Sequence, residues 1–313
     1  MNGFRTLACA AMMLVPSFSA LHAQGDRGDR NRRFGDERRR IDTTVPFKKN
    51  GEISLEVIVG DIRVTGWAKD EVRIVATSMG SPIDARITSE SIALDADRGG
   101  RARLELNVPI GVSIDVSSQT GTIIISGTKG PVSVETQAAT VEVSDVAGRG
   151  DFETAAGRLT LQRLEGRIAV ATLGGAVNIT EIRGALEMES TGGIMSVDRA
   201  DLTELDFTSV GDAFNFSGTL AAQGRHSIET VSGAITLRFP DNFGASIEFD
   251  TFSGQFHPID FPVTLQPNSG TGRGRSVERQ PFTINGGGAR IQIDTHSGDV
   301  FLRKIGVPER KER

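Results

Sequence analysis

Cysteine, tyrosine and tryptophan are nearly missing from this chain of 313 residues. It contains one Cys, no Tyr and one Trp, and aromatic residues make up 5% of it. A single thiol excludes an intrachain disulfide and any zinc site built from several Cys ligands. The chain is rich instead in Gly, with 37 residues, and in the β-branched types that favour strands. This composition predicts an all-β protein that packing and hydrogen bonds stabilise.

An excess of positive charge is also missing. The 35 Lys and Arg residues are outnumbered by 40 Asp and Glu, which gives a formal net charge of −5. Nucleic-acid binding depends on a basic surface that neutralises phosphates. We therefore expect no nucleic-acid partner.

The N-terminal apolar run, from Leu7 to Val15, is too short to span a membrane. It follows Arg5 and precedes small residues that end at Ala23, which is the layout of a secretory signal peptide. We therefore expect a signal peptide over residues 1–23 and a mature chain without a transmembrane segment. Cys9 lies inside the run, away from the position of a lipid-attachment cysteine. Export predicts a location in the periplasm, on the outer surface or in the medium.

The remaining chain divides by composition. Residues 24–45 are rich in Arg, Asp and Gly and are expected to form a disordered linker, and residues 305–313 a charged tail. Between them, alternating apolar residues predict one β-solenoid domain over 46–305. It comprises N-terminal capping strands (46–110), regular repeats (111–260), a loop insertion (261–282) and a final coil (283–304). Trp67 is expected to cover the open end of the core.

An internal repeat is the most informative feature of the sequence. A small residue recurs nine times, with a spacing of 18 through the first six copies, and a hydroxyl stands three positions before it each time. Two residues before the hydroxyl the side chain is apolar in eight copies, and Asp206 is the exception. The small residues are Gly121, Ala139, Gly157, Gly175, Gly193, Gly211, Gly233, Gly254 and Gly298, and the hydroxyls are Ser118, Thr136, Thr154, Thr172, Ser190, Thr208, Thr230, Thr251 and Thr295.

The period of the repeat predicts the fold. Eighteen extended residues at about 3.3 Å each make a loop of roughly 60 Å, which closes as one coil of two or three short strands. Successive coils then stack about 4.8 Å apart. The predicted fold is an all-β, single-stranded parallel β-helix or β-solenoid, with right-handed winding preferred over left-handed. Alternation places the hydroxyls inside, each bonded to its neighbour or to a backbone carbonyl.

Short motifs frame the repeats. They are Gly60-Asp61-Ile62-Arg63-Val64-Thr65-Gly66-Trp67 with Asp70-Glu71-Val72, Val108-Pro109-Ile110-Gly111, and Thr295-His296-Ser297-Gly298-Asp299-Val300. In this order, and with the repeat between them, they resemble the bacterial "putative adhesin" domain family over roughly residues 50 to 304. The resemblance implies a surface or periplasmic β-solenoid and brings no catalytic residue. Departures are Ala139 in place of Gly, and Asp206 and Asn215 at expected core positions.

An acidic stripe is predicted on the outward side, next to the hydroxyl column. Like charges stacked in register repel each other, so the stripe is either a solvated face that discourages aggregation or a surface for a partner. Ala169 and Ala171 interrupt it. With two basic residues of the loop insertion, the candidate interaction residues are Glu135, Asp151, Glu153, Glu187, Glu189, Glu229, Asp250, Asp294, Arg273 and Arg275; Asp115 continues the stripe.

The sequence offers no constellation for catalysis. A catalytic hydroxyl would be needed once, beside a base, whereas nine copies indicate architecture. His226, His257 and His296 have no second ligand at a metal-binding spacing and are interpreted as surface residues. We therefore predict no catalytic, metal or cofactor-binding residue, and no cofactor.

Three functions are compatible with these features. The preferred one is a non-enzymatic cell-envelope module, adhesin-like, that binds a glycan or an envelope protein. The alternative is a carbohydrate-active enzyme, a polysaccharide lyase or glycosidase, with Asp151 and Glu153 facing Glu187 and Glu189 across a groove. A third is an envelope sensor scaffold that acts with a membrane partner.

Export is directly testable. Expressed in a bacterium, the chain should be recovered outside the cytoplasm with Gln24 as its first residue, because Ala23 is a small residue at the cleavage site. N-terminal sequencing and intact mass measure this. An Ala23→Arg variant should accumulate uncut, whereas Ala11→Leu, inside the apolar run, should still be processed. A cytoplasmic chain of full mass would contradict the prediction.

Overall fold

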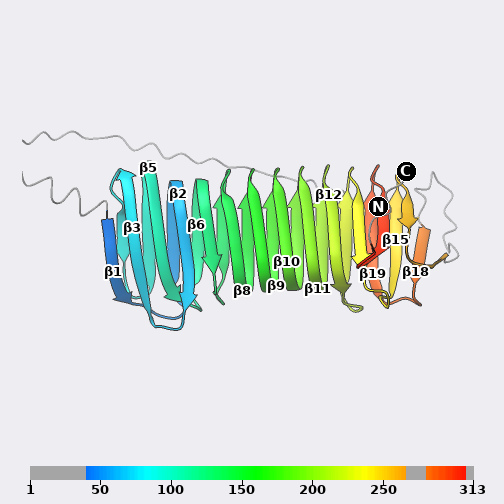
Figure 1. Ribbon diagram of the computed structural model, residues 1–313, viewed down its shortest axis with the longest axis horizontal. Helices are drawn as coiled ribbons and strands as arrows, with labels where there is room; N and C mark the ends of the chain where they lie inside the picture. Colours follow the sequence, from blue (N-terminus) through cyan, green and yellow to red (C-terminus); the bar gives the residue numbers. More distant parts are fainter. Residues whose placement is uncertain (1–39, 266–279, 308–313) are drawn as a thin grey trace, which may run out of the picture.

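The computed structural model describes residues 40–265 and 280–307, and this part of the chain forms 20 strands and no helix. All 20 strands hydrogen-bond into one long sheet that winds into an elongated, solenoid-like stack (Figure 1). The all-β prediction is confirmed. No helix that could cross a membrane occurs in these two ranges. The predicted signal peptide and residues 24–39 of the predicted linker lie outside them.

The strands follow the alternating pattern of the sequence. Their bounds are β1 (Arg40–Pro46), β2 (Glu52–Trp67), β3 (Glu71–Gly80), β4 (Asp84–Ile87), β5 (Ser91–Pro109), β6 (Ser113–Ser126), β7 (Val132–Thr136), β8 (Thr140–Thr154), β9 (Arg158–Thr172), β10 (Ala176–Ser190), β11 (Ile194–Ser209), β12 (Ala213–Leu220), β13 (Arg225–Thr230), β14 (Ile235–Phe239), β15 (Ala245–Thr251), β16 (Phe256–Pro258), β17 (Val263–Leu265), β18 (Gln280–Ile284), β19 (Ala289–Thr295) and β20 (Val300–Lys304). β1 begins inside the segment expected to be linker, because Ile41, Thr43 and Val45 alternate as a strand requires.

Each long strand in the middle of the stack forms most of one coil. β8, β9 and β10 have 15 residues each and pair in parallel with one another. Val141 pairs with Leu159, and Leu159 pairs with Val177, so one step along the stack advances the chain by 18 residues. Equivalent residues of successive coils therefore lie directly beside each other.

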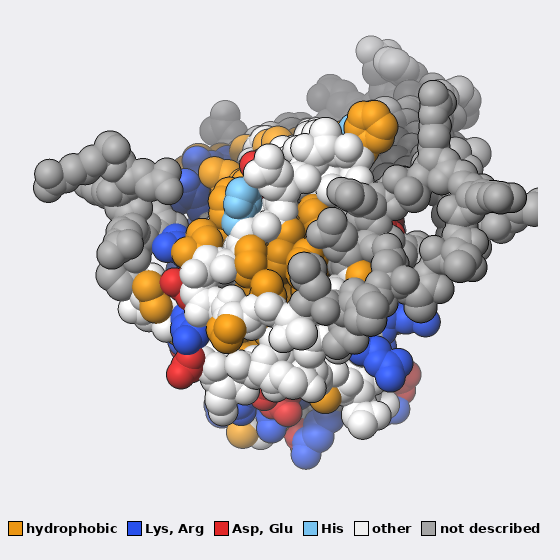
Figure 2. Space-filling model, turned by 90° about the vertical axis from the view of Figure 1, so that its right-hand side faces the viewer, with side chains coloured by type: hydrophobic (Ala, Val, Ile, Leu, Met, Phe, Trp, Pro, Cys, Tyr) orange, Lys and Arg blue, Asp and Glu red, His pale blue; other side chains and the backbone are white. Residues whose placement is uncertain are grey.

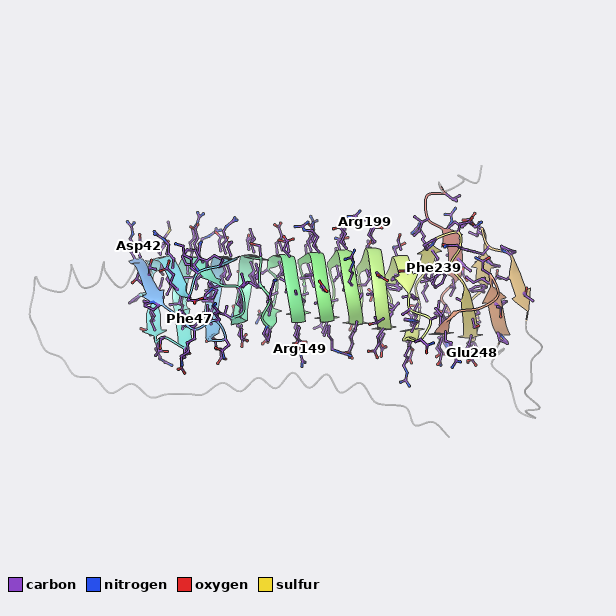
Figure 3. All side chains as sticks on the ribbon, turned by 90° about the horizontal axis from the view of Figure 1, so that it is seen from below. Asp42, Phe47, Arg149, Arg199, Phe239 and Glu248 are labelled. Atoms are coloured by element: carbon purple, nitrogen blue, oxygen red, sulfur yellow. The ribbon has the colours of Figure 1, made fainter. Side chains whose placement is uncertain are left out.

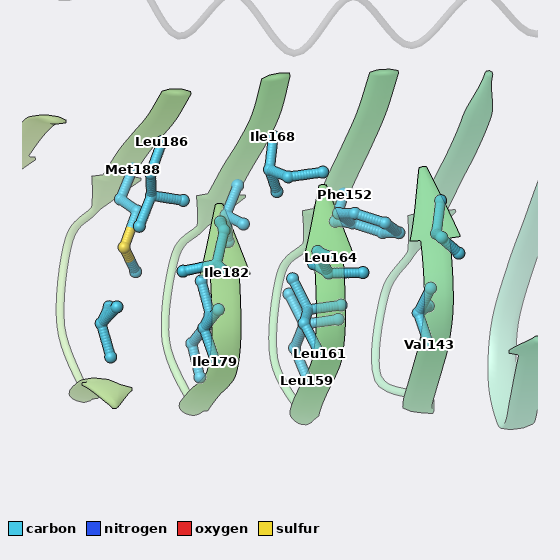
Figure 4. Packing of buried hydrophobic residues seen from close by; sticks show 14 of the residues in the cluster. Val143, Phe152, Leu159, Leu161, Leu164, Ile168, Ile179, Ile182, Leu186 and Met188 are labelled. Carbon is cyan, nitrogen blue, oxygen red and sulfur yellow. The ribbon is translucent and has the colours of Figure 1, made fainter. Parts of the chain in front are cut away.

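The core fills the space that each coil encloses. In β9, Leu159 and Leu161 of the first half, Leu164 in the middle, and Ile168 and Val170 of the second half are buried, while Thr160 and Ala169 alternate with them and are partly exposed. Figure 4 shows such side chains between the strands of adjacent coils. Burial of each one contributes about 1.5–3 kcal/mol, so the same inward positions in every coil supply the stability.

The hydroxyl column lies inside, and most of its members bond within their own coil, whereas the hydroxyls of Ser209 and Thr230 contact each other from coil to coil at 3.3 Å. Thr154 and Thr172 donate to carbonyl oxygens two residues further on, at 3.0 and 2.8 Å, and the backbone N–H of Ala139 donates to Thr136 at 3.2 Å. These hydroxyls thus close the turns of their own coils, as Ser and Thr side chains do in tight turns, whereas the buried hydroxyl of Ser190 has no hydrogen-bond partner among the described residues. The buried members are Ser118, Thr136, Thr154, Thr172, Ser190, Ser209, Thr230 and Thr295.

One coil carries an extra residue that shifts the repeat. Gly184 pairs with Leu202, but the next residue, Ala185, pairs with Glu204, which leaves Thr203 as a β-bulge. A shift by one residue exchanges the inward and outward faces of the strand beyond it.

The bulge corrects the assignments made for this coil. Asp206 and Thr208 point outward, and the small residue Gly211 is exposed. The inward positions belong to Phe207, Ser209, Asp212 and Phe214, each one residue later than expected, and Asn215 is likewise not a core residue. Among the described residues, neither carboxylate oxygen of the buried Asp212 has a hydrogen-bond partner.

The corner of each coil needs backbone conformations that few residues adopt. Gly148, Gly166 and Gly184 form a column with φ of +125°, +128° and +118°. A second column has non-Gly residues in the left-handed region, with φ between +51° and +60°, and they alternate in charge: Asp145, Arg163, Glu181 and Arg199. Arg163 binds Asp145 at 2.6 and 2.8 Å, which holds the pKa of that carboxyl below its usual value.

The order of the stack departs from the order of the chain at both ends. β2 lies between β5 and β6, and β19 lies between β13 and β15, as the red strand among yellow ones in Figure 1 shows. Beyond these coils the pairing turns antiparallel, in β1, β3 and β4 at one end and in β17 and β18 at the other. Figure 2 shows the second end, where apolar side chains gather in the middle.

Two predicted roles are wrong. Trp67 does not cover the end of the core: β2 has a strand on each side, and the indole N–H donates to the carbonyl of Glu71 at 2.7 Å. His226 is not a surface residue: it is 1% exposed, in an inward position that pairs with Leu205 and Ile291. The imidazole ring is tolerated in the core because its Nε2 lies 2.9 Å from the carbonyl oxygen of Ala221, within hydrogen-bond distance. Burial lowers the pKa of His226.

A glycine pair tests the corner. Gly166→Ala should cost about 1–3 kcal/mol, because φ is +128° and the new Cβ would collide with the carbonyl oxygen of Gly148. Gly174→Ala in the adjoining turn is the matched control, since its Cβ would meet nothing closer than 3.5 Å. Urea unfolding of both variants measures the difference. Equal stabilities would contradict the corner geometry.

Candidate functional site

The sheet pairing gathers the predicted acidic stripe into one column. Glu135 pairs with Glu153, and Glu153 with Ala171, on β7, β8 and β9. Ala171 in turn pairs with Glu189 of β10. Because a parallel register repeats in every coil, these outward positions lie along a single line on the surface.

The column continues to the far end of the stack. Beyond Glu189 comes Thr208, which pairs with Glu229 of β13. Glu229 then pairs with Asp294, and Asp294 pairs with Asp250. The three consecutive carboxylates come from β13, β19 and β15, so the late insertion of β19 brings Asp294 into the column out of chain order.

A second acidic column runs beside the first. Asp151 pairs with Ala169, Ala169 with Glu187, and Glu187 with Asp206. The sequence placed Asp206 in the core, and the bulge at Thr203 turns it outward instead. A repeat alignment that allowed one inserted residue, with Phe207 and Phe214 as the apolar positions, would have found it. Together we call these two columns the acidic face.

A notch interrupts the acidic face where the two alanines lie. A shallow depression of about 80 Å³ is lined by Asp151, Glu153, Glu187 and Glu189, with Ala169 and Ala171 between the two pairs. The pairs are two coils apart, or roughly 10 Å along the stack at the usual strand spacing. The four carboxylates that the sequence singled out thus do border one depression.

Repulsion on the acidic face changes the proton affinity of its members. Burial, and then the neighbouring Asp294 and Asp206, raise the pKa of Glu229 above its usual value. The pKa of Asp206 is raised by burial and by Glu204. The raised pKa values mean that Glu229 and Asp206 hold a proton more tightly in the folded chain than an isolated carboxylate does.

Basic residues contact members and neighbours of the acidic face, and Arg225 lies close enough to Asp206 to oppose the rise of its pKa. Arg149 binds Asp151 at 2.9 Å, and Arg167 binds Glu204 at 3.2 Å. Both arginines are more than half exposed, and such exposed pairs contribute little to stability. Of the remaining candidate residues, Arg273 and Arg275 lie outside the described part of the chain. Within that part, no three Asp, Glu or His side chains are grouped closely enough to hold a metal ion.

Comparison with known proteins identifies the family. The model of the Toastrack DUF4097 family matches residues 28–303. The chain belongs to this family. The match confirms the resemblance to an adhesin-like domain of unknown function, built from β-repeats, that the framing motifs indicated.

The other comparisons add little. No curated protein matches the chain. One solved structure, of a "putative cell adhesion protein" from Clostridium sporogenes, aligns with 85% of this chain and 99% of its own, at 9% sequence identity and a TM-score of 0.21.

The raised pKa of Glu229 gives a pH-dependent prediction. Above that pKa the folded chain carries the cost of burying the charge of Glu229 and then its repulsion from Asp294, so Glu229→Gln should raise the melting temperature at pH 7 by about 1–2 °C. As the pH falls towards 4.5, Glu229 becomes protonated in the folded wild type at a higher pH than in the unfolded chain, which stabilises the folded state. The difference in melting temperature between the variant and the wild type therefore disappears.

The control for this prediction is Glu142→Gln. Glu142 is exposed on the first half of β8, and its register neighbours, Ile124 and Thr160, carry no charge. Differential scanning calorimetry from pH 4 to 8 should show no comparable gain for it. A destabilised Glu229→Gln at pH 7 would refute the repulsion.

Proposed function

We propose that this protein is an exported, non-enzymatic module of the cell envelope, adhesin-like, which binds a basic partner through its acidic face. The partner is a protein segment rich in Lys and Arg or a glycan with amino groups. In this proposal the stack is a right-handed, single-chain parallel β-solenoid with coils of about 18 residues. Membership in the Toastrack family and the signal-like N-terminus support it.

The observation that carries the proposal is the register of the acidic face. Glu229, Asp294 and Asp250 follow one another without a neutral residue between them. Aligned carboxylates create a negative potential along this line of the surface, which attracts a cationic partner. Electrostatic complementarity of this kind speeds association and favours partners of opposite charge.

Neutralising the face tests the proposal. The triple variant Glu153→Gln, Glu189→Gln, Glu229→Gln should bind polylysine and amino-glucan oligosaccharides at least tenfold more weakly, because it removes three of the aligned charges. The affinity of the wild type should also fall as salt rises. Titration calorimetry measures both effects.

A matched variant separates the face from the total charge. Glu105→Gln, Glu142→Gln and Asp198→Asn remove the same charge from β5, β8 and β11, at positions outside the two columns of the acidic face. This variant should retain the affinity of the wild type. An equal loss in both variants would show that binding depends only on net charge and would refute the proposal.

The notch favours one alternative function, a glycoside hydrolase. Inverting enzymes place two carboxyl groups about 6.5–9.5 Å apart across the sugar, and Asp151 and Glu153 border the notch two coils from Glu187 and Glu189, roughly 10 Å at the usual strand spacing. The depression, about 80 Å³, is well below the usual size of a small-molecule site, which ranks this function second. Release of reducing sugar from a polysaccharide panel, abolished by Glu153→Gln alone, would establish it.

A further inference from the structure

Four strands end the stack, and they differ in length. Each pairs with only one neighbour among the described residues: β1 with β3, β4 with β5, β16 with β20 and β17 with β18. β1 has seven residues, whereas β4 has four and the other two have three each. Short edge strands are a common protection against further pairing. β1 lacks that protection.

The free backbone groups of β1 can be assigned. The N–H of Phe47 donates to the carbonyl of Asp70, on the side of β3. Because successive residues of a strand point their N–H groups to opposite sides, those of Val45, Thr43 and Ile41 also point to β3. The N–H and C=O groups of the residues between them therefore point away from it: those of Arg40, Asp42 and Thr44, and the C=O of Pro46.

This free edge is complementary to itself in one antiparallel register. With Thr43 opposite Thr43 of a second copy, Asp42 faces Thr44 and Arg40 faces Pro46. Each Asp42–Thr44 pair exchanges two hydrogen bonds, and each Arg40–Pro46 pair adds one, to the carbonyl of the proline, which makes six in all. Pro46, which has no backbone N–H, lies at the end of the paired segment and therefore interrupts no hydrogen bond within it.

Neighbouring registers fit less well. A register centred on Asp42 sets the two Asp42 carboxylates opposite each other, which is repulsive. One centred on Thr44 leaves Arg40 without a partner and shortens the overlap. In the Thr43 register no two like charges are directly opposed, and Asp42 keeps its contact with Arg73 at 3.2 Å.

The inward side chains of β1 favour the same arrangement. Ile41 and Val45 are partly buried against the core, and the burial pattern shows the inward residues of β1 only half covered. In the Thr43 register Ile41 lies opposite Val45 of the second copy, on the same side of the sheet. The core would thus continue across the junction. Figure 3 shows β1, with Asp42 labelled, at the extreme end of the stack.

We propose that two copies of this chain join end to end by antiparallel pairing of β1 with β1, centred on Thr43. The pair has twofold symmetry, as most homodimers do. It doubles the length of the stack and presents two acidic faces. The inference is independent of the proposed function, because β1 contributes no residue to the acidic face.

Blocking the edge tests the dimer. Sedimentation velocity of the exported chain should show a species of twice the monomer mass that dissociates on dilution. Thr44→Pro removes one outward N–H and leaves the bonds to β3 intact, since the N–H of Thr44 points away from β3. It should weaken the dimer at least tenfold. Thr44→Ala keeps the N–H and should dimerise as the wild type does.

A cross-link tests the register. In a chain with Cys9→Ser, which leaves no other thiol, Thr43→Cys should form an intermolecular disulfide on oxidation. Directly opposite residues of this type have Cα atoms about 4.5 Å apart, within the range that a disulfide spans. Thr44→Cys is the control, because its symmetry mate lies diagonally, at about 7–8 Å or more.

Three outcomes would overturn the inference. The first is a monomer at all concentrations with no cross-link through Thr43→Cys. The second is a dimer that Thr44→Pro leaves intact, which would place the contact elsewhere. The third is a monomer that dimerises through β1 only after residues 24–38 are deleted, which would assign the edge to the preceding segment.

Discussion

Parallel pairing in register decides what every position of this protein must tolerate. In the parallel coils of the middle of the stack, a residue lies between its equivalents in the two neighbouring coils, about 4.8 Å away. Leucine therefore packs on valine or isoleucine in the core, glycine follows glycine at the corner, and charge meets charge on the surface. The side chain at a given position must therefore be compatible with the equivalent side chains above and below it in the stack.

The columns deal with charge in two different ways. At the corner, Asp145, Arg163, Glu181 and Arg199 alternate in sign and bind each other, although each occupies a left-handed conformation that costs roughly 1–2 kcal/mol. The acidic face has no such alternation at Glu229, Asp294 and Asp250. Alternation was thus available to this architecture, and the proposed function assigns the face without it to a partner of opposite charge.

The repeat was sufficient to predict the inward residues, the buried hydroxyls and the acidic stripe, because each depends on alternation within one coil. It failed where a single residue changed the phase: Thr203 bulges, and the partners Asp206 and Phe207 exchange faces. His226 was misjudged because an isolated polar residue gives no sign that its ring can bond a carbonyl such as that of Ala221. The order of the coils in the stack could not be predicted, because the spacing of the repeats along the sequence does not show which coils pair with each other.

That order has a consequence for how the protein is made. β19 and β20 are the last strands of the chain, yet they fill the place between the coil of β13 and β14 and that of β15 and β16. A chain that emerges from its N-terminus, through a ribosome or a membrane channel, exposes a gap in the stack until the final segment arrives. A copy cut short before residue 289 would lack this coil and Asp294, and β13, β14, β15 and β16 would each lose the strand that pairs with them there.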